Sequence, residues 1–287
     1  MPGYPFHDPQ LQAELLELAK TGVEHATIGV SLNGKAIHQY SVPTAIAVPF
    51  QEQPEWQVLS IPDIAQRVAA LVERGLGDGS GKTDAQSRHV ILVEGDAGSG
   101  KTTFAKALAS ALPSAALIHV DDISWWLDWL DWSDAMLDGI VRPWLAGERV
   151  DYRPPGWIDK GRAGSVTAPV YPVGAAEGQA ERYLVIEGMA AGRPELEAVA
   201  SLLVFVTSDP VIARERLLGR DTGTTRDDAT AGTSRAEEYA FYAESQQILV
   251  PFILNQQPWS RAKLIVDGTA ETSPDTYRVS FESALYH

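Results

Sequence analysis

The chain of 287 residues contains no cysteine, so it can form neither a disulfide framework nor a thiolate metal site. Basic residues are also scarce, with 23 lysines and arginines against 38 aspartates and glutamates, which gives a formal net charge of −15. A nucleic-acid backbone and an anionic membrane would both repel such a chain. We therefore expect no nucleic acid and no membrane as a general partner.

Long apolar runs are missing as well. No stretch approaches the roughly 18 apolar residues of a membrane span, and the first ten residues lack a basic segment followed by an apolar core. We therefore expect a cytoplasmic protein. An apolar content of 45% nevertheless supplies a sizeable core, enough for one large domain or for one domain with a smaller companion.

Residues 90–104, VILVEGDAGSGKTTF, carry the strongest pattern in the chain. The all-apolar run at 90–93 is typical of a strand buried in a parallel sheet, and residues 95–102 then fit the Walker A pattern G-x-x-x-x-G-K-[ST]. Its glycines let backbone N–H groups point at a phosphate, Lys101 adds a positive charge, and Thr102 offers a hydroxyl to Mg²⁺. The expected nucleotide contacts are Gly95, Asp96, Ala97, Gly98, Ser99, Gly100, Lys101, Thr102 and Thr103.

The residues before this loop predict an accessory α+β region, 1–87, with a helix at 9–20. Two alternating segments, 26–32 and 35–42, flank Asn-Gly and predict a β-hairpin. Pro62 opens a further helix that extends to about residue 75. The stretch 75–87 is rich in Gly, Asp and Ser and predicts a boundary, although this region could also pack onto the sheet of the part that follows.

Residues 88–287 predict a nucleotide-binding domain. Apolar strands alternate there with helices, as in an α/β protein whose parallel sheet is covered by helices on both faces, and together with the phosphate loop this pattern predicts a P-loop NTPase fold. The expected strands are 89–94, 115–120, 182–187, 201–206 and 262–266. The expected helices follow the phosphate loop, occupy part of the Trp-rich stretch 124–146, and lie at about 209–220 and 234–250.

Acidic residues follow two of these strands. Asp121 and Asp122 come after 115–120, and Glu187 ends 182–187. Ligands in an open parallel sheet lie beyond the carboxyl ends of the strands, so these carboxylates should face the phosphates. We expect Asp121 to accept a hydroxyl proton and Glu187 to organise Mg²⁺, although Asp122 could be the base instead. Alternatively, either aspartate caps the next helix, and Glu187 is an ordinary solvated residue.

Two further patterns concern a lid and an acceptor pocket. Arg216 and Arg220 lie four apart on one helical face before the polar segment 221–233, which predicts a lid that neutralises phosphoryl charge; solvated or paired arginines are the alternative. Six of the eight tryptophans fall between 125 and 157, and positions 125, 129 and 132 would share a helical face. They predict either a pocket wall or internal packing. The pocket residues would be Asp122, Trp125, Trp126, Trp129 and Arg153, while His119 is expected to be a buried structural histidine.

With these motifs the chain resembles the uridine kinase-like branch of P-loop kinases, which includes phosphoribulokinase and pantothenate kinase. The resemblance covers about residues 88–270 and adds three matches to the phosphate loop: 121–123, where Ile123 replaces an aromatic residue, Glu187-Gly188, and the Arg216, Arg220, Asp221 pattern. It implies ATP and Mg²⁺ as cofactors and phosphoryl transfer to a hydroxyl of a small metabolite. It does not extend to uridine, because the Trp-rich acidic stretch replaces the acceptor elements.

The sequence therefore predicts an ATP-dependent small-molecule kinase with Lys101, Asp121, Arg216 and Arg220 as catalytic residues. A nucleotide kinase is the first alternative, but it would need basic residues where 124–138 offers four aspartates and no lysine or arginine. A nucleotide-binding switch or regulatory ATPase is the second. Homo-oligomerisation, the acceptor and the role of residues 1–87 stay open.

Overall fold

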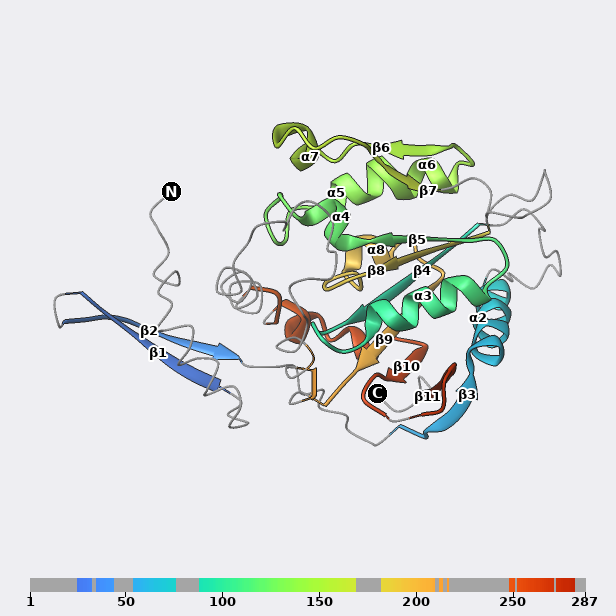
Figure 1. Ribbon diagram of the computed structural model, residues 1–287, viewed down its shortest axis with the longest axis horizontal. Coiled ribbons are helices and arrows are strands. Elements are labelled where there is room, and N and C mark those ends of the chain that lie inside the picture. Colours follow the sequence, from blue (N-terminus) through green and yellow to red (C-terminus); the bar gives the residue numbers. More distant parts are fainter. Residues whose placement is uncertain are drawn as a thin grey trace.

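A computed structural model gives the fold of this chain (Figure 1). It describes residues 25–32, 35–43, 54–75, 88–168, 182–209, 212–213, 216, 248–250, 252–270 and 272–281, the first two ranges as backbone alone. The predicted helix at 9–20 and most of the helices expected at 209–220 and 234–250 lie outside these residues.

The centre of the fold is a seven-stranded sheet in the order β3-β11-β10-β9-β4-β8-β5. Its five neighbouring strands from β10 to β5 run parallel, while β11 is antiparallel to both β10 and β3. The bounds are β3 Gln57–Ser60, β4 His89–Gly95, β5 Ala115–His119, β8 Tyr183–Glu187, β9 Leu202–Thr207, β10 Leu264–Asp267 and β11 Thr276–Ser280. The five predicted strands are thus confirmed, and the two antiparallel ones extend the sheet.

Alternate residues of the central strands build a separate core on each face of the sheet. Ile91 and Val93 of β4 pack with helices α2 (Ile61–Gly75) and α3 (Lys101–Ala111), whereas Leu92 of the same strand packs on the opposite side. That side is covered by α4 (Val120–Ser124), α5 (Ser133–Met136), the π-helical turn η2 (Leu137–Val141), α6 (Arg142–Leu145) and α8 (Pro194–Glu197). Figure 1 shows helices on both sides of the sheet. The structure therefore has the α/β P-loop NTPase fold that the sequence predicts.

Two smaller features complete the described chain. The strands β1 (His25–Leu32) and β2 (Lys35–Pro43) form the predicted antiparallel hairpin. A second antiparallel pair, β6 (Val150–Tyr152) and β7 (Val166–Ala168), lies beside α6 (Figure 1). Helix α7 (Pro155–Asp159) connects its two strands along the chain, and the pair has no counterpart in the sequence prediction.

The region predicted as accessory, 1–87, contributes directly to the main sheet. Its strand β3 pairs with β11, and its helix α2 covers the same face as α3. Residues 57–75 are therefore built into the layer that carries the phosphate loop, which is the second of the two arrangements that the sequence left open.

Candidate functional site

The phosphate loop lies between β4 and α3. Gly98 and Gly100 have φ angles of 79° and 92°, a region that glycine enters without steric cost. Ser99 N–H donates to the Asp96 carbonyl (3.1 Å), which closes a turn, and Lys101 Nζ lies 3.5 Å from the same oxygen. The lysine thus folds back over the loop at the N-terminus of α3, where the helix dipole and the free N–H groups favour a phosphate.

Thr102 and Glu187, which are 85 positions apart in the chain, meet beside this loop. Thr102 Oγ1 lies 3.2 Å from each carboxylate oxygen of Glu187, which ends β8 and is 4% exposed. A hydroxyl and a carboxylate are hard oxygen ligands of the kind that Mg²⁺ prefers, so the pair fits this ion. Within the described ranges there is no group of three or more His, Cys, Asp or Glu side chains that could hold a metal. In phosphate sites Mg²⁺ commonly takes its other ligands from phosphates and water.

His119 contacts the same carboxylate. It ends β5 and stands opposite Glu187 in the parallel pairing of β5 with β8, and its Nδ1 makes a close contact with Glu187 Oε1. This hydrogen bond raises the pKa of His119. Burial acts to raise the pKa of Glu187, but the bond from His119 and the charge of Lys101 outweigh it and hold that pKa below its usual value. The sequence predicts a buried structural histidine; the structure instead places a 30% exposed one against the expected metal carboxylate.

Asp121 and Asp122 lie in the first turn of α4, directly after His119. His119 is the N-cap residue of α4, so neither aspartate occupies the capping position of this helix. The charge of Asp122 contributes to the raised pKa of His119, which places this carboxylate near the pair with Glu187. Asp121 is exposed at the carboxyl end of the sheet, where an acceptor hydroxyl could reach it.

The tryptophans that follow do not share a helical face, so this part of the prediction is wrong. Helix α4 ends at Ser124, α5 begins at Ser133, and residues 125–132 form turns. The reason is local: the side chain of Asp128 accepts the N–H of Leu130 (3.2 Å), a contact with the backbone two residues on that competes with helix formation.

These tryptophans divide into two groups. Trp132 and Trp144 are each 1% exposed and belong to the core, so the packing alternative is correct for them. Trp125, Trp126 and Trp129 are half-buried and stay candidates for a pocket wall.

Arg153, the other predicted acceptor contact, bonds to the backbone after α7. Its Nη2 donates to the carbonyl of Arg162 (2.8 Å), and the Arg162 guanidinium in turn lies 3.8 Å from the centre of the Trp157 ring and 5.7 Å from that of Trp126. These contacts tie β6 and α7 to the Trp-rich turns. None of these contacts involves the phosphate loop.

A cavity of about 480 Å³ lies between the phosphate loop and the carboxyl ends of β9 and β10. Gly98 and Gly100 line it together with Arg216, whose Nη1 donates to the Gly268 carbonyl (2.6 Å). The first predicted lid arginine is therefore next to the phosphate loop, while Arg220 lies outside the described residues. The cavity is also lined by Thr103, Phe104, Val206, Val266, Asp267, Ala270, Thr272 and Tyr277.

The loop after β10 forms the far wall of this cavity and was not assigned a role from the sequence. A Cβ on Gly268 would lie 1.8 Å from the Ser99 carbonyl oxygen, so only glycine fits against the phosphate loop there. Asp267 Oδ1 accepts the N–H groups of Thr269 and Ala270 (3.0 and 3.1 Å), which fixes the following turn. The Asp-Gly sequence after an apolar strand was the available signal for such a wall.

Glu94 is the other site residue that sequence reasoning missed. It precedes Gly95 in β4, is 1% exposed, and accepts backbone N–H groups from the phosphate loop and from the turn after Glu187. Burial raises its pKa to about 7, against the opposing effects of these N–H groups and of Lys101. A carboxyl group with so strongly shifted a pKa beside a phosphate loop is a candidate functional residue.

Three comparisons with known proteins were made. No protein-family model and no curated protein matches the chain. Among solved structures, the chain is similar to a possible uridine kinase from Bacillus stearothermophilus, with 16% identity, a TM-score of 0.38, and coverage of 71% of this chain and 98% of that one. It is also similar to a candidate fructose transport system kinase from a Silicibacter species, with 18% identity, a TM-score of 0.39, and coverage of 71% and 95%.

At such identities and TM-scores the similarity is remote, so the functional conclusion has to rest on the residues of the site. In the part of the chain that the structure describes, no helix is long and apolar enough to cross a membrane.

Proposed function

We propose that the chain is an ATP-dependent kinase that transfers the γ-phosphoryl group to a hydroxyl of a small molecule. The observation that carries this proposal is the meeting of Thr102 and Glu187 at the phosphate loop, with Asp121 after the neighbouring strand. A nucleotide switch needs the first two residues. An accessible carboxylate at this place is what a kinase adds to them.

The residues divide the work as follows. The loop N–H groups and Lys101 bind the β- and γ-phosphates, and the cavity beside Arg216 receives the nucleoside end. Thr102 and Glu187 would hold Mg²⁺, which when bound neutralises charge on the phosphates. His119 keeps Glu187 oriented, as a partner outside the metal's own ligands commonly does.

In the transfer step the acceptor oxygen forms a bond to the γ-phosphorus while the bond from that phosphorus to the β–γ bridging oxygen breaks. ADP leaves with the electron pair of the broken bond. The hydroxyl proton passes to the Asp121 carboxylate, and Arg216 contributes positive charge at the side of Gly100. Asp122 and the half-buried tryptophans would then bind the acceptor.

The test is ADP release from Mg·ATP with a panel of nucleosides, sugars, amino sugars, aminoglycosides and pantothenate-like alcohols. Lys101→Ala serves as the blank. We expect one acceptor class to raise ADP release well above the acceptor-free rate. A substantial rate that no acceptor changes would instead favour the nucleotide switch.

Asp121→Asn and Asp122→Asn together test which of the two aspartates accepts the hydroxyl proton. The first should lower turnover at least about 100-fold with nearly unchanged ATP affinity, the usual size of a lost general base. The second should raise the acceptor KM more than it lowers kcat. The reverse result would assign the base to Asp122.

A further inference from the structure

The turn Gly188–Arg193 lies where the expected metal carboxylate, the phosphate loop and the Trp-rich segment come together. It follows Glu187 directly, and Gly188 N–H donates to the Val93 carbonyl of β4 (3.2 Å). Ala190 within it has a φ of 60°, a left-handed conformation that is unfavourable for a residue with a Cβ. Such a conformation persists only where surrounding contacts impose it.

Glu94 supplies these contacts from the side of the phosphate loop. Its Oε1 accepts the N–H groups of Gly95 (2.9 Å) and Ala190 (3.1 Å), and its Oε2 accepts that of Gly192 (2.8 Å). One buried carboxylate thus joins the first residue of the phosphate loop to two residues of the turn. Three backbone N–H groups thus depend on one buried side chain, and a buried donor that loses its acceptor costs free energy.

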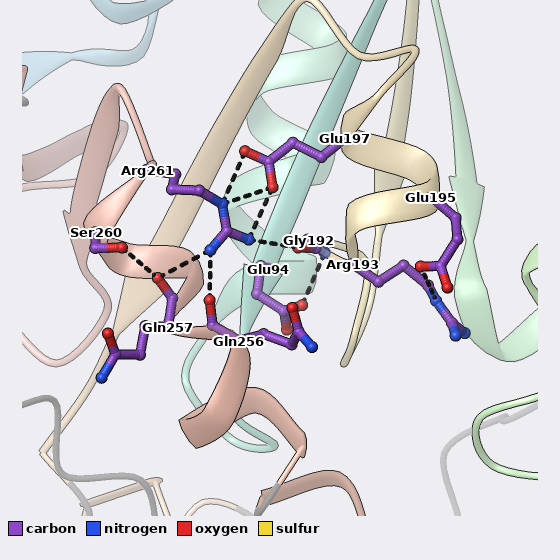
Figure 2. Close-up of polar contacts among 9 residues, drawn as sticks. All are labelled: Glu94, Gly192, Arg193, Glu195, Glu197, Gln256, Gln257, Ser260 and Arg261. Carbon is purple, nitrogen blue, oxygen red and sulfur yellow. Dashed lines mark hydrogen bonds and ion pairs between the residues drawn. The ribbon is translucent and has the colours of Figure 1, made fainter.

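Arg261 holds the same turn from the opposite side. Its Nη2 donates to the Gly192 carbonyl (3.3 Å), while its Nε bonds both carboxylate oxygens of Glu197 (2.8 and 3.0 Å) and its Nη1 donates to the carbonyl of Gln256. Figure 2 shows Arg261 between Glu197 and Gly192, with Glu94 reaching Gly192 as well. The N–H and the C=O of a single residue are therefore held by the side chains of Glu94 and Arg261.

Gly192 is also closely enclosed. A Cβ at this position would lie 3.1 Å from both Leu203 Cδ1 and Pro258 Cβ, and 3.4 Å from Glu94 Cβ. The turn therefore has little room to move while both charged side chains are in place.

We propose that Glu94 and Arg261 are positioning residues that clamp Gly192 and thereby fix the turn after Glu187, so that the carboxylate stands correctly against Thr102 and the phosphate loop. The inference rests on the proposed function only in its use of Glu187 as a metal ligand. Arg261 acts through backbone groups of the turn, and Glu94 acts through these groups and through the N–H of Gly95 in the phosphate loop.

The test measures binding of the non-hydrolysable analogue AMP-PNP to the full chain by calorimetry, in excess Mg²⁺ and again in EDTA. The Kd in EDTA divided by the Kd in Mg²⁺ measures how much the metal ion strengthens binding. This ratio therefore reports how well the metal side of the site is arranged. Glu94→Gln retains an acceptor oxygen but turns an amide N–H₂ toward the N–H of Gly192, and Arg261→Gln releases the Gly192 carbonyl without touching the phosphate loop. We expect each variant to lower the ratio roughly 10-fold, the effect of one lost charged hydrogen bond.

The double variant decides whether the two residues act as one clamp. We expect it to lower the ratio no further than the more affected single variant, because either change already releases the turn. Additive losses, or an unchanged ratio in both single variants, would overturn the proposal. Ser260→Ala is the matched control, since Ser260 lies in the same region, bonds the Gln257 carbonyl and does not touch the turn. Its ratio should equal that of the original chain.

Two further measurements separate the possible failures. Thermal melting of each variant must remain a single transition, and Arg261→Lys replaces Arg261→Gln if the latter does not fold, because lysine keeps the charge but loses the fork that spans several acceptors. If Lys101→Ala leaves AMP-PNP affinity unchanged, the proposed nucleotide site itself fails. If that affinity falls while the metal ratio is insensitive to Glu94 and Arg261, the positioning proposal alone is wrong.

Discussion

Replacing Glu94 by glutamine should change how the stability of the protein depends on pH. Burial raises the pKa of Glu94 from 4.5 to about 7, and this effect exceeds the opposing effects of the N–H groups of Gly192, Gly95 and Ala190 and of the charge on Lys101. The native state therefore keeps its proton up to about pH 7, whereas the unfolded chain loses it near 4.5. Between these values the native state binds more protons than the unfolded state does.

The sign and size of the effect follow from this difference. Stability from this group is fully present below about pH 4.5 and is lost as the pH rises through about 7, because deprotonation then costs more in the folded protein than in the unfolded chain. The two pKa values correspond to about 3 kcal/mol of unfolding free energy. Glutamine cannot titrate, so Glu94→Gln should lack this pH-dependent loss entirely.

The assay is urea denaturation of both proteins at several pH values from 4.5 to 8.5, with the difference between the two unfolding free energies plotted against pH. Other titrating groups are common to both chains and largely cancel. We expect the original chain to lose about 3 kcal/mol relative to the variant across this range, mostly below pH 7. A flat difference, or one that moves in favour of the original chain as pH rises, would show that the three N–H donors outweigh desolvation and that Glu94 is ionised throughout.

Further predictions concern the same site. Gly268→Ala should lower the free energy of unfolding by about 1–3 kcal/mol and weaken AMP-PNP binding, because the added methyl group displaces the phosphate loop; unchanged melting and calorimetry would contradict this. His119→Asn should reduce the Mg²⁺ dependence of AMP-PNP affinity roughly 10-fold through a less well oriented Glu187, and an unaltered Kd ratio would remove His119 from that role. Nucleotide binding near pH 7.5 should be accompanied by proton uptake, since phosphates offset the charge that lowers the pKa of Glu94; calorimetry in buffers of different ionisation enthalpy should detect uptake that Glu94→Gln abolishes.

The parallel part of the sheet could be predicted because its strands are short apolar runs, and β4, β8 and β10 end in glycine or an acidic residue. Such runs lie buried on both faces of a sheet, and their carboxyl ends meet at one edge. This logic brings Thr102 and Glu187 together from sequence alone, although they are 85 positions apart. The antiparallel strands β3 and β11 were not predicted, since their pairing joins residues near 58 and 278, and neither segment carries a signal for the other.

The helix predicted from the spacing of the tryptophans is absent where a short-range polar contact stabilises a different backbone conformation. The spacing of Trp125, Trp129 and Trp132 fits a helix, but α4 ends at Ser124 and Asp128 bonds to the backbone of Leu130 in the turns that follow. Glu94 was missed for a different reason. In the sequence it looks like the last residue of a strand, and the turn that satisfies its carboxylate comes almost 100 positions later.

The turn 188–193 also explains why one tryptophan of the Trp-rich segment had to be buried. Arg193, which ends the turn, is 5% exposed; its Nη2 donates to the Leu130 carbonyl (2.9 Å) and its guanidinium lies 5.0 Å from the centre of the Trp132 ring. Arginine cannot lose its charge, and here the Glu195 carboxylate (3.1 Å from Nε), the Leu130 carbonyl and the aromatic ring together receive it. Trp132 therefore supports, through Arg193, the same turn in which Glu94 holds Ala190 and Gly192. Through this turn, direct contacts join the phosphate loop to the expected acceptor side. A substitution that displaces one of them should therefore also displace the other.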